Sequence, residues 1–133
     1  MEVRILLDSN AYSQWKRGHA RVAELIRSSS AILVPLVVIG ELLYGFRHGS
    51  RAERNIAEFR TFVANPQVNV IGMTMITADR YANIAARLRQ LGRPVPTNDI
   101  WIAAHAMEAG AELVSLDRHF AAIDGLSWIH VAQ

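Results

Sequence analysis

The sequence predicts one α/β domain: a three-layer α/β/α sandwich with a mainly parallel central sheet. Short apolar runs typical of buried strands alternate with longer helical segments along the whole chain. Such alternation implies right-handed crossovers, which place helices on both faces of a parallel sheet. The length of 133 residues, 51% of them hydrophobic, is that of one domain with its own core. Because repeats and linkers are lacking, we expect residues 1–133 to form a single domain.

Each predicted strand is a short apolar run that ends at a polar residue or a proline. The first run, VRILL, ends at Asp8-Ser9-Asn10, residues that often cap a following helix. The second ends at Pro35, and the fourth, ELVSL, ends at Asp117. The predicted strands cover residues 3–7, 31–35, 68–71, 112–116 and 127–131.

Predicted helices separate these strands. The segment 36–46 is apolar nearly all round and predicts a buried helix, interrupted by Gly40 and Gly45. Thr77 is the expected N-cap of a later helix, and Gly110 is expected to end the last one. A turn is predicted at 118–123. Besides the helix after Asp8, the predicted helices cover residues 19–28, 36–46, 47–63 (one helix or a pair), 77–91 and 97–109.

Composition excludes several classes of protein. Cysteine is absent, so disulfides, thiolate catalysis and Cys-based metal sites are ruled out. No apolar run is as long as the roughly 18 residues that a membrane span needs, and the first residues lack the apolar stretch of a signal peptide. We therefore expect a soluble, cytoplasmic protein without a membrane partner.

The basic residues are almost all arginines. Thirteen of the fourteen are Arg and only Lys16 is Lys, within a net charge of +2. Arginine suits phosphate because its planar fork can hold two oxygens at once. A biased genome composition would explain the same pattern, so the charge alone does not choose a partner.

Carboxylates occur where the predicted fold would bring them together. Asp8 and Asp117 follow predicted strands directly, and the ligand sites of open parallel sheets lie beyond the carboxyl ends of strands. Asp99 opens a predicted helix. Glu41 lies in the apolar helix, where an unpartnered charge would cost several kcal/mol, on the order of the penalty for a buried ion. A Mg²⁺ ion shared among the four acids, with Mn²⁺ as a substitute, would compensate these charges.

Each acid also has a simpler explanation. Asp8 and Asp117 could be helix caps, Asp99 could interact with a helix dipole, and Glu41 could pair with an arginine. Capping does not explain why a buried acid accompanies the others, so the joint pattern favours a metal site. Residues interpreted as structural, or as belonging to turns or the surface, are Asp79, Asp124, His105, His119, Trp15, Trp101 and Trp128.

The same acids carry a resemblance to a known family. The segments LLDSN, VVIGELLYG, GRPVPTNDIWIAAHA and LVSLDRHF occur in the order and spacing of PIN domains, and most resemble VapC-type toxins of toxin–antitoxin pairs. The resemblance covers nearly the whole chain and implies that the four acids are both catalytic and metal-binding. Ser115 stands where the family often has Thr, which keeps a hydroxyl. The accessory polar positions that the resemblance implies are Ser9, Asn10, Asn98 and Ser115.

The resemblance also implies a function and partners. It implies an endoribonuclease that leaves 5′-phosphate and 3′-hydroxyl ends, acts on structured RNA such as tRNA, and is restrained by a small VapB-like antitoxin. A homodimer is expected as the commonest closed assembly. The sequence does not decide between one metal ion and two. The candidate RNA-facing arginines are Arg47, Arg51, Arg54 and Arg93, with His48 beside them.

The sequence argues against one other class of protein and leaves a second one open. A phosphate-transfer module of the receiver or haloacid-dehalogenase type would need a further acid near Asp8 and a late lysine, but position 10 is Asn and the only lysine is Lys16. A non-catalytic PIN-like module that binds RNA or protein stays open, because an intact set of acids indicates metal capacity and not turnover.

Overall fold

A computed structural model describes residues 2–133, and its central feature is a parallel sheet with the strand order β3-β2-β1-β4-β5. All four strand pairs are parallel, with Leu6 opposite Leu33 on one side and Leu113 on the other. The predicted fold class is confirmed. The strands are β1 (Arg4–Leu7), β2 (Ala31–Pro35), β3 (Val68–Ile71), β4 (Glu112–Ser115) and β5 (Trp128–His130).

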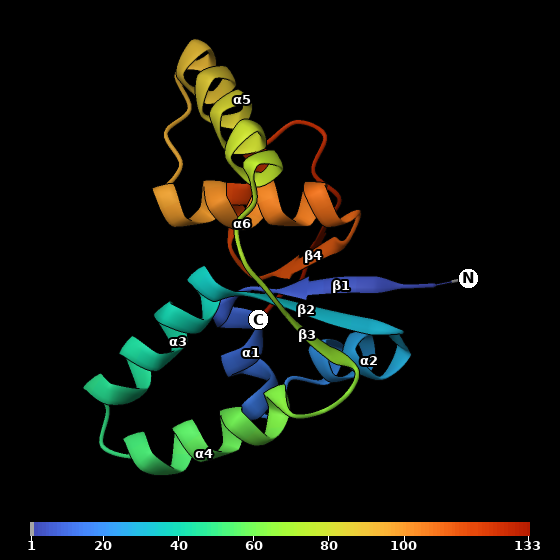
Figure 1. Ribbon diagram of the computed structural model, residues 1–133, viewed down its shortest axis with the longest axis vertical. Helices are drawn as coiled ribbons and strands as arrows, with labels where there is room; N and C mark the ends of the chain where they lie inside the picture. The colour runs from blue at the N-terminus through green and yellow to red at the C-terminus, as the bar shows by residue number, and fades with distance from the viewer. Residues whose placement is uncertain (1) are drawn as a thin grey trace.

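The helices form a layer on each side of this sheet. Figure 1 shows α5 and α6 on one side, with α5 packed on α6 and farther from the strands, and α1, α2 and α4 on the other side. Helix α3 packs against α1, α4 and α6. Over residues 2–133, none of the helices combines the length and apolar character needed to cross a bilayer. The helices are α1 (Ser9–Lys16), α2 (Ala20–Ser28), α3 (Leu36–His48), α4 (Ala52–Val63), α5 (Met75–Leu91), α6 (Thr97–Ala109) and the 3₁₀ helix η1 (Arg118–Ala122).

The strand order reverses direction between β1 and β4. From β1 the chain moves to β2 and β3 on one side, and then returns to place β4 on the other side of β1. The connections after β1 and β4 therefore diverge, which leaves a crevice at the carboxyl ends of these two strands. Asp8 and Asp117 lie at that crevice, so the topology alone brings two of the predicted acids together.

Apolar packing fixes the elements that carry the site. Ile5, Leu6 and Leu7 of β1 are almost wholly buried, as expected for a central strand covered on both faces. An aromatic cluster joins α1, α3 and α4, in which the Tyr12 ring lies 5.3 Å from those of Phe59 and Phe62. Trp15 belongs to this cluster, with its ring 5.2 Å from Phe62, and so has the structural role expected of it.

Helix α3 differs from the prediction in two respects. Gly40 and Gly45 do not interrupt it, since the helix runs unbroken from Leu36 to His48. Nor is it buried all round, because Leu36 is 57% exposed and Tyr44 72% exposed. The exposed face of α3 is itself apolar, so the sequence shows no helical periodicity of apolar and polar residues. The exposed face therefore could not be predicted from the sequence.

The start of α5 was also predicted wrongly. Thr74, and not Thr77, is the N-cap, and its hydroxyl accepts hydrogen bonds from the backbone N–H groups of Ile76 and Thr77. Thr77 is the buried third residue of the helix, and its hydroxyl accepts a bond from the Thr74 N–H to complete a capping box. Asp79 consequently lies beyond the first turn of α5. The helix dipole acts most strongly within that first turn.

Candidate functional site

Asp8 connects the end of β1 to the start of α1. It is the N-cap of α1, and its Oδ1 accepts a hydrogen bond from the Ala11 N–H at 2.9 Å. Its Oδ2 accepts a bond from the Ser115 hydroxyl. Only 5% of Asp8 is exposed, and this burial raises the pKa of its carboxyl to about 6 against the opposing effect of the two hydrogen bonds. The capping explanation is therefore confirmed for Asp8, and the same side chain also lines the cavity described below.

Ser115 and Asp117 occupy the matching positions after β4. Ser115 is fully buried, and its hydroxyl donates to Asp8 while accepting from the Asp117 N–H at 2.9 Å. Asp117 is the N-cap of η1 and accepts from the His119 N–H at 2.8 Å. The Ser115 hydroxyl thus ties together the chain segments that carry both acids. Ser115 itself does not line the cavity that contains the acids.

Asp99 and His119 lie close together, beside Asp117. Asp99 lies in the first turn of α6, and its Oδ2 is 3.1 Å from His119 Nδ1, which is also 2.9 Å from Asp117 Oδ1. Burial raises the pKa of Asp99, opposed by the His119 hydrogen bond, and the Asp117 charge raises it further. The same hydrogen bond, which Asp99 accepts, raises the pKa of His119.

Glu41 approaches the other acids from α3. Its Oε2 accepts a hydrogen bond from the Asn98 amide at 3.3 Å. Within residues 2–133 its buried Oε1 has no hydrogen-bond partner. Burial raises the pKa of Glu41 against the opposing effects of the Asn98 amide and the nearby Ser9 hydroxyl. Glu41 is half-buried, so it is less enclosed than the apolar sequence around it predicts.

All four predicted acids line one cavity of about 460 Å³. One oxygen each of Asp99 and Asp117 and one ring nitrogen of His119 lie within 4.8 Å of one another. Asp8 and Glu41 line the same cavity outside that tightest group. We call the cavity lined by all four acids the acid cavity. Its lining residues are Asp8, Ser9, Asn10, Glu41, Pro96, Thr97, Asn98, Asp99, Ile102, Asp117 and His119.

The donors of the acid cavity fit a hard divalent cation. Carboxylate oxygens are the ligands that Mg²⁺ and Mn²⁺ prefer, and the unsatisfied Oε1 of Glu41 is a buried acceptor of that kind. Burial and mutual repulsion raise the pKa of Asp8 and Asp99, so the cavity favours neutralisation of its charge. A bound cation would meet this need without protonation of the acids.

His119 is a site residue that the sequence analysis missed. A lone histidine is more often structural, and residue type alone did not distinguish this one from His105. His105 is indeed buried in α6, where burial lowers its pKa. The available signal was position: His119 follows Asp117 by two residues at a strand end, the place where ligands collect in this class of fold.

The predicted RNA-facing arginines divide into two groups. Arg51 and Arg54 line a second cavity next to the acid cavity. Arg47 and Arg93 line neither cavity. Asp79 and Asp124 lie outside the acid cavity, as expected, and Asp124 pairs with Arg87 at 3.5 Å in the turn that also contains Gly125.

Comparison with known proteins identifies the family. The model of the PIN domain matches residues 5–126. Ribonuclease VapC2 of Haemophilus influenzae is 30% identical over 115 residues, which cover 85% of this chain and 86% of the relative. The tRNA(fMet)-specific endonuclease VapC of Shigella flexneri is 30% identical over 127 residues, 93% of this chain and 95% of the relative. The chain therefore belongs to the PIN domain family, as one of its VapC-type members.

Solved structures agree in fold. VapBC-1 from nontypeable Haemophilus influenzae superposes with a TM-score of 0.85 at 24% identity, over 96% of this chain and 98% of that one. VapBC2 from Rickettsia felis, bound to a DNA fragment from its promoter, gives 0.83 at 24% identity, over 97% and 99%. At this identity the likeness shows the shared fold.

Proposed function

We propose that this chain is a metal-dependent endoribonuclease and the toxin of a toxin–antitoxin pair. The observation that carries the proposal is the acid cavity, where four carboxylates from four separate segments meet at the point of strand reversal. Burial and the neighbouring acids raise the pKa of Asp8. Acids that are brought together with a raised pKa are typical of sites that bind a cation. The ribonuclease names of the VapC relatives support the same reaction.

Asp8, Glu41, Asp99 and Asp117 would hold Mg²⁺ or Mn²⁺ in this cavity. When bound, the cation supplies the Lewis acidity that hydrolysis of a phosphodiester requires. The Ser115 hydroxyl and the Ala11 N–H orient Asp8, and the Asn98 amide orients Glu41, so that these oxygens face the cavity before any ligand arrives. Such pre-organisation limits the rearrangement that binding would otherwise require.

His119 is proposed to adjust the charge of the cavity. Its Nδ1 lies between the carboxylates of Asp99 and Asp117 and can hold a proton there. That proton would reduce the repulsion between the two acids when no cation is bound. Because His119 is half-exposed at the mouth of the cavity, its ring can turn outward when a cation takes over this role.

The substrate proposed is structured RNA such as tRNA, cut to leave 5′-phosphate and 3′-hydroxyl ends. One relative is named as a tRNA(fMet)-specific endonuclease, which supports this class of substrate. The similar solved structures are VapBC complexes, which supports a small VapB-like antitoxin as the partner. We expect a basic side chain of this antitoxin to reach the acid cavity and to compete with the cation.

A direct experiment separates this function from a non-catalytic PIN-like module that binds RNA or protein. Purified protein is incubated with end-labelled tRNA in Mg²⁺, in Mn²⁺, or with a chelator. The proposal predicts discrete fragments with 3′-hydroxyl ends in either metal and intact tRNA with the chelator. Bound but uncut tRNA in both metals would contradict the nuclease and support the binding module.

A further inference from the structure

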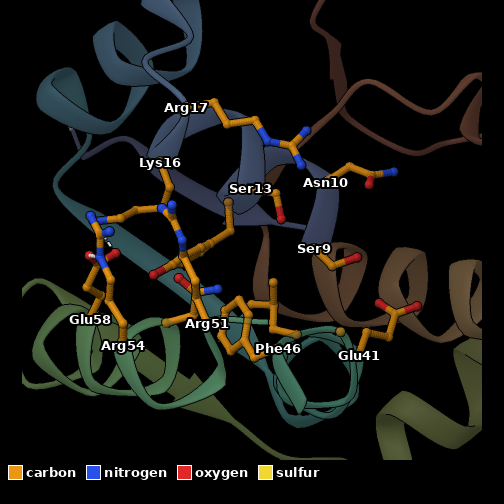
Figure 2. Close-up of a pocket in the computed structure, with 14 residues that line it drawn as sticks. Ser9, Asn10, Ser13, Lys16, Arg17, Glu41, Phe46, Arg51, Arg54 and Glu58 are labelled. Atoms are coloured by element: carbon orange, nitrogen blue, oxygen red, sulfur yellow. Dashed lines mark hydrogen bonds and ion pairs between the residues drawn. The ribbon is translucent and has the colours of Figure 1, made fainter. Parts of the chain in front are cut away.

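A second cavity of about 600 Å³ adjoins the acid cavity, with walls formed by α1, α3 and α4 (Figure 2). We call it the α1–α4 cavity. Ser9, Asn10 and Glu41 line both cavities, so the two cavities meet at these residues. A chain molecule whose reacting group lies at the acids can therefore extend into the α1–α4 cavity.

The charge of the α1–α4 cavity is opposite to that of its neighbour. Four basic side chains line it: Lys16 and Arg17 at the end of α1, and Arg51 and Arg54 at the start of α4. They outnumber its two acids, Glu41 and Glu58. Positive charge beside an acidic, cation-binding pocket is the arrangement that a polyanion with one reacting phosphate requires.

Only part of this positive charge is balanced within the protein. Glu58 lies 3.7 Å from Lys16 Nζ and 3.2 Å from Arg54 Nε. Over residues 2–133, Arg17 and Arg51 make no ion pair within 4.0 Å and are exposed. Figure 2 shows the Arg17 guanidinium directed toward Asn10, at the end of the cavity that meets the acids. Two guanidinium groups are thus available to a ligand.

We propose that the α1–α4 cavity binds the sugar–phosphate backbone of single-stranded RNA on one side of the cleaved bond. Arg17 and Arg51 are the phosphate ligands, and Glu58 limits the affinity by holding Lys16 and Arg54. The inference rests on the proposed ribonuclease function and adds to it the residues that position the substrate.

The lining favours an RNA strand over other polyanions. The guanidinium fork matches phosphate oxygens, while the side chains of Asn10, Ser13 and Asn55 offer donors and acceptors to ribose and base. The ring of Phe46 adds an apolar surface of the kind on which bases pack. A hollow between helices admits a single strand, whose bases are splayed, more readily than a duplex.

The test uses charge changes of both signs. Affinity for a labelled single-stranded oligoribonucleotide is measured by fluorescence anisotropy with a chelator present, so that no cleavage occurs. Arg17→Gln and Arg51→Gln should each weaken binding by roughly three- to tenfold and reduce the salt slope by about 0.7, the value for one lost phosphate contact on a single strand. Glu58→Gln should tighten binding by about threefold, because Lys16 and Arg54 lose their ion-pair partner and become available to phosphate.

Matched controls exclude a general effect of net charge. Arg60→Gln and Glu53→Gln make the same changes of charge on exposed positions of α4 outside both cavities, and should leave affinity within about twofold. Melting curves confirm that every variant is folded. Cavity variants that behave like these controls would overturn the inference. So would variants that alter binding of an oligo-aspartate peptide but not of RNA, since the cavity would then fit an acidic protein segment.

The inference and the proposed function can fail separately. A protein that cleaves no RNA, yet binds it with the predicted response to both signs of change, supports the α1–α4 cavity and contradicts the nuclease. A protein that cleaves RNA in Mg²⁺ with unaltered KM in Arg17→Gln and Arg51→Gln contradicts the α1–α4 cavity and leaves the nuclease standing.

Discussion

Asp8 serves the fold and the site with the same two oxygens. Its Oδ1 caps α1 through Ala11, and its Oδ2 is tied to β4 through Ser115. Both bonds stabilise the ionised form, yet burial dominates and the pKa rises to about 6 from an ordinary value of 3.8. The folded, metal-free protein therefore holds this charge at a cost that an unfolded chain does not bear.

We predict that Asp8→Asn stabilises the metal-free protein near neutral pH. Because the folded state binds the Asp8 proton more tightly than the unfolded state, the wild type loses stability as pH rises from about 4 to about 6. A difference of about two pKa units corresponds to about 3 kcal/mol. Urea unfolding of both proteins with a chelator should show no gap at pH 4 and the full gap at pH 7. A gap independent of pH would contradict the role assigned to burial.

His119 gives a second prediction at the same scale. Its raised pKa is due first to the hydrogen bond with Asp99, so the ion pair supports the metal-free fold at low pH and is lost as pH rises through that pKa. Asp99→Asn should therefore lower the His119 pKa, and so should added Mg²⁺ in the wild type. NMR titration of the ring measures both, with Asp79→Asn as the control. An unaltered His119 titration in Asp99→Asn would show that the contact is absent in solution.

Among the elements, those with the clearest sequence signals were predicted best. The strands at Val68–Ile71 and Ala31–Pro35 were predicted to the residue, because apolar runs between turn residues leave little choice. Gly110 ends α6 in the left-handed conformation, as predicted. The prediction at Thr77 was wrong because burial decides which of two threonines caps a helix, and burial is set by distant contacts. The prediction at Gly40 was wrong because one glycine costs a helix only about 1 kcal/mol, and the packing of α3 against α1, α4 and α6 holds the helix together.

The continuity of α3 can be tested through its glycines. Gly40 is helical and exposed, and a Cβ added there would meet nothing within 4 Å. We predict that Gly40→Ala stabilises the protein by about 0.5–1 kcal/mol, seen as a melting temperature about 2–4 °C higher. Gly92→Ala is the matched control: its surroundings are equally open, but φ is 65°, so it should destabilise. Destabilisation by Gly40→Ala would indicate a break in α3.

The elements also explain which site residues the sequence could predict. Asp8, Asp99 and Asp117 occupy strand ends or a helix start, positions that can be inferred from local patterns. Lys16 and Arg17 lie at the far end of α1, and only the packing of α1 against α3 and the adjoining α4 places them beside Arg51. Because their role depends on tertiary structure, the sequence did not indicate Lys16 and Arg17. For the same reason it gave Arg47 and Arg93 the same weight as Arg51.

Taken as a whole, the molecule combines an acidic cavity and a basic one on a body with a net charge of +2. The reversal of strand order at β1 and β4 brings the acids together. The connection from α3 to α4 places arginines in the neighbouring cavity. Large apolar side chains at Leu36, Met75 and Ile76 remain exposed. A symmetric dimer, predicted from general preferences, would have apolar surface to bury.

The toxin role makes a prediction about living cells. Expression of this chain alone should arrest growth, and co-expression of a small protein encoded beside it should restore growth through a complex that survives purification. An active ribonuclease free in a cell would degrade the RNA on which growth depends. Harmless expression of protein that cleaves RNA in vitro would contradict the toxin role and leave the nuclease standing.

Cleavage of RNA by matched Asp→Asn variants tests the central claim most directly. Asp99→Asn alters the acid cavity, whereas Asp79→Asn and Asp124→Asn make the same chemical change outside it. In saturating Mg²⁺, single-turnover cleavage of labelled tRNA should fall by about a hundredfold or more in Asp99→Asn, because the cation loses a ligand. The two control variants should match the wild type. Wild-type cleavage by Asp99→Asn, or an equal loss in all three variants, would contradict the assignment of the site.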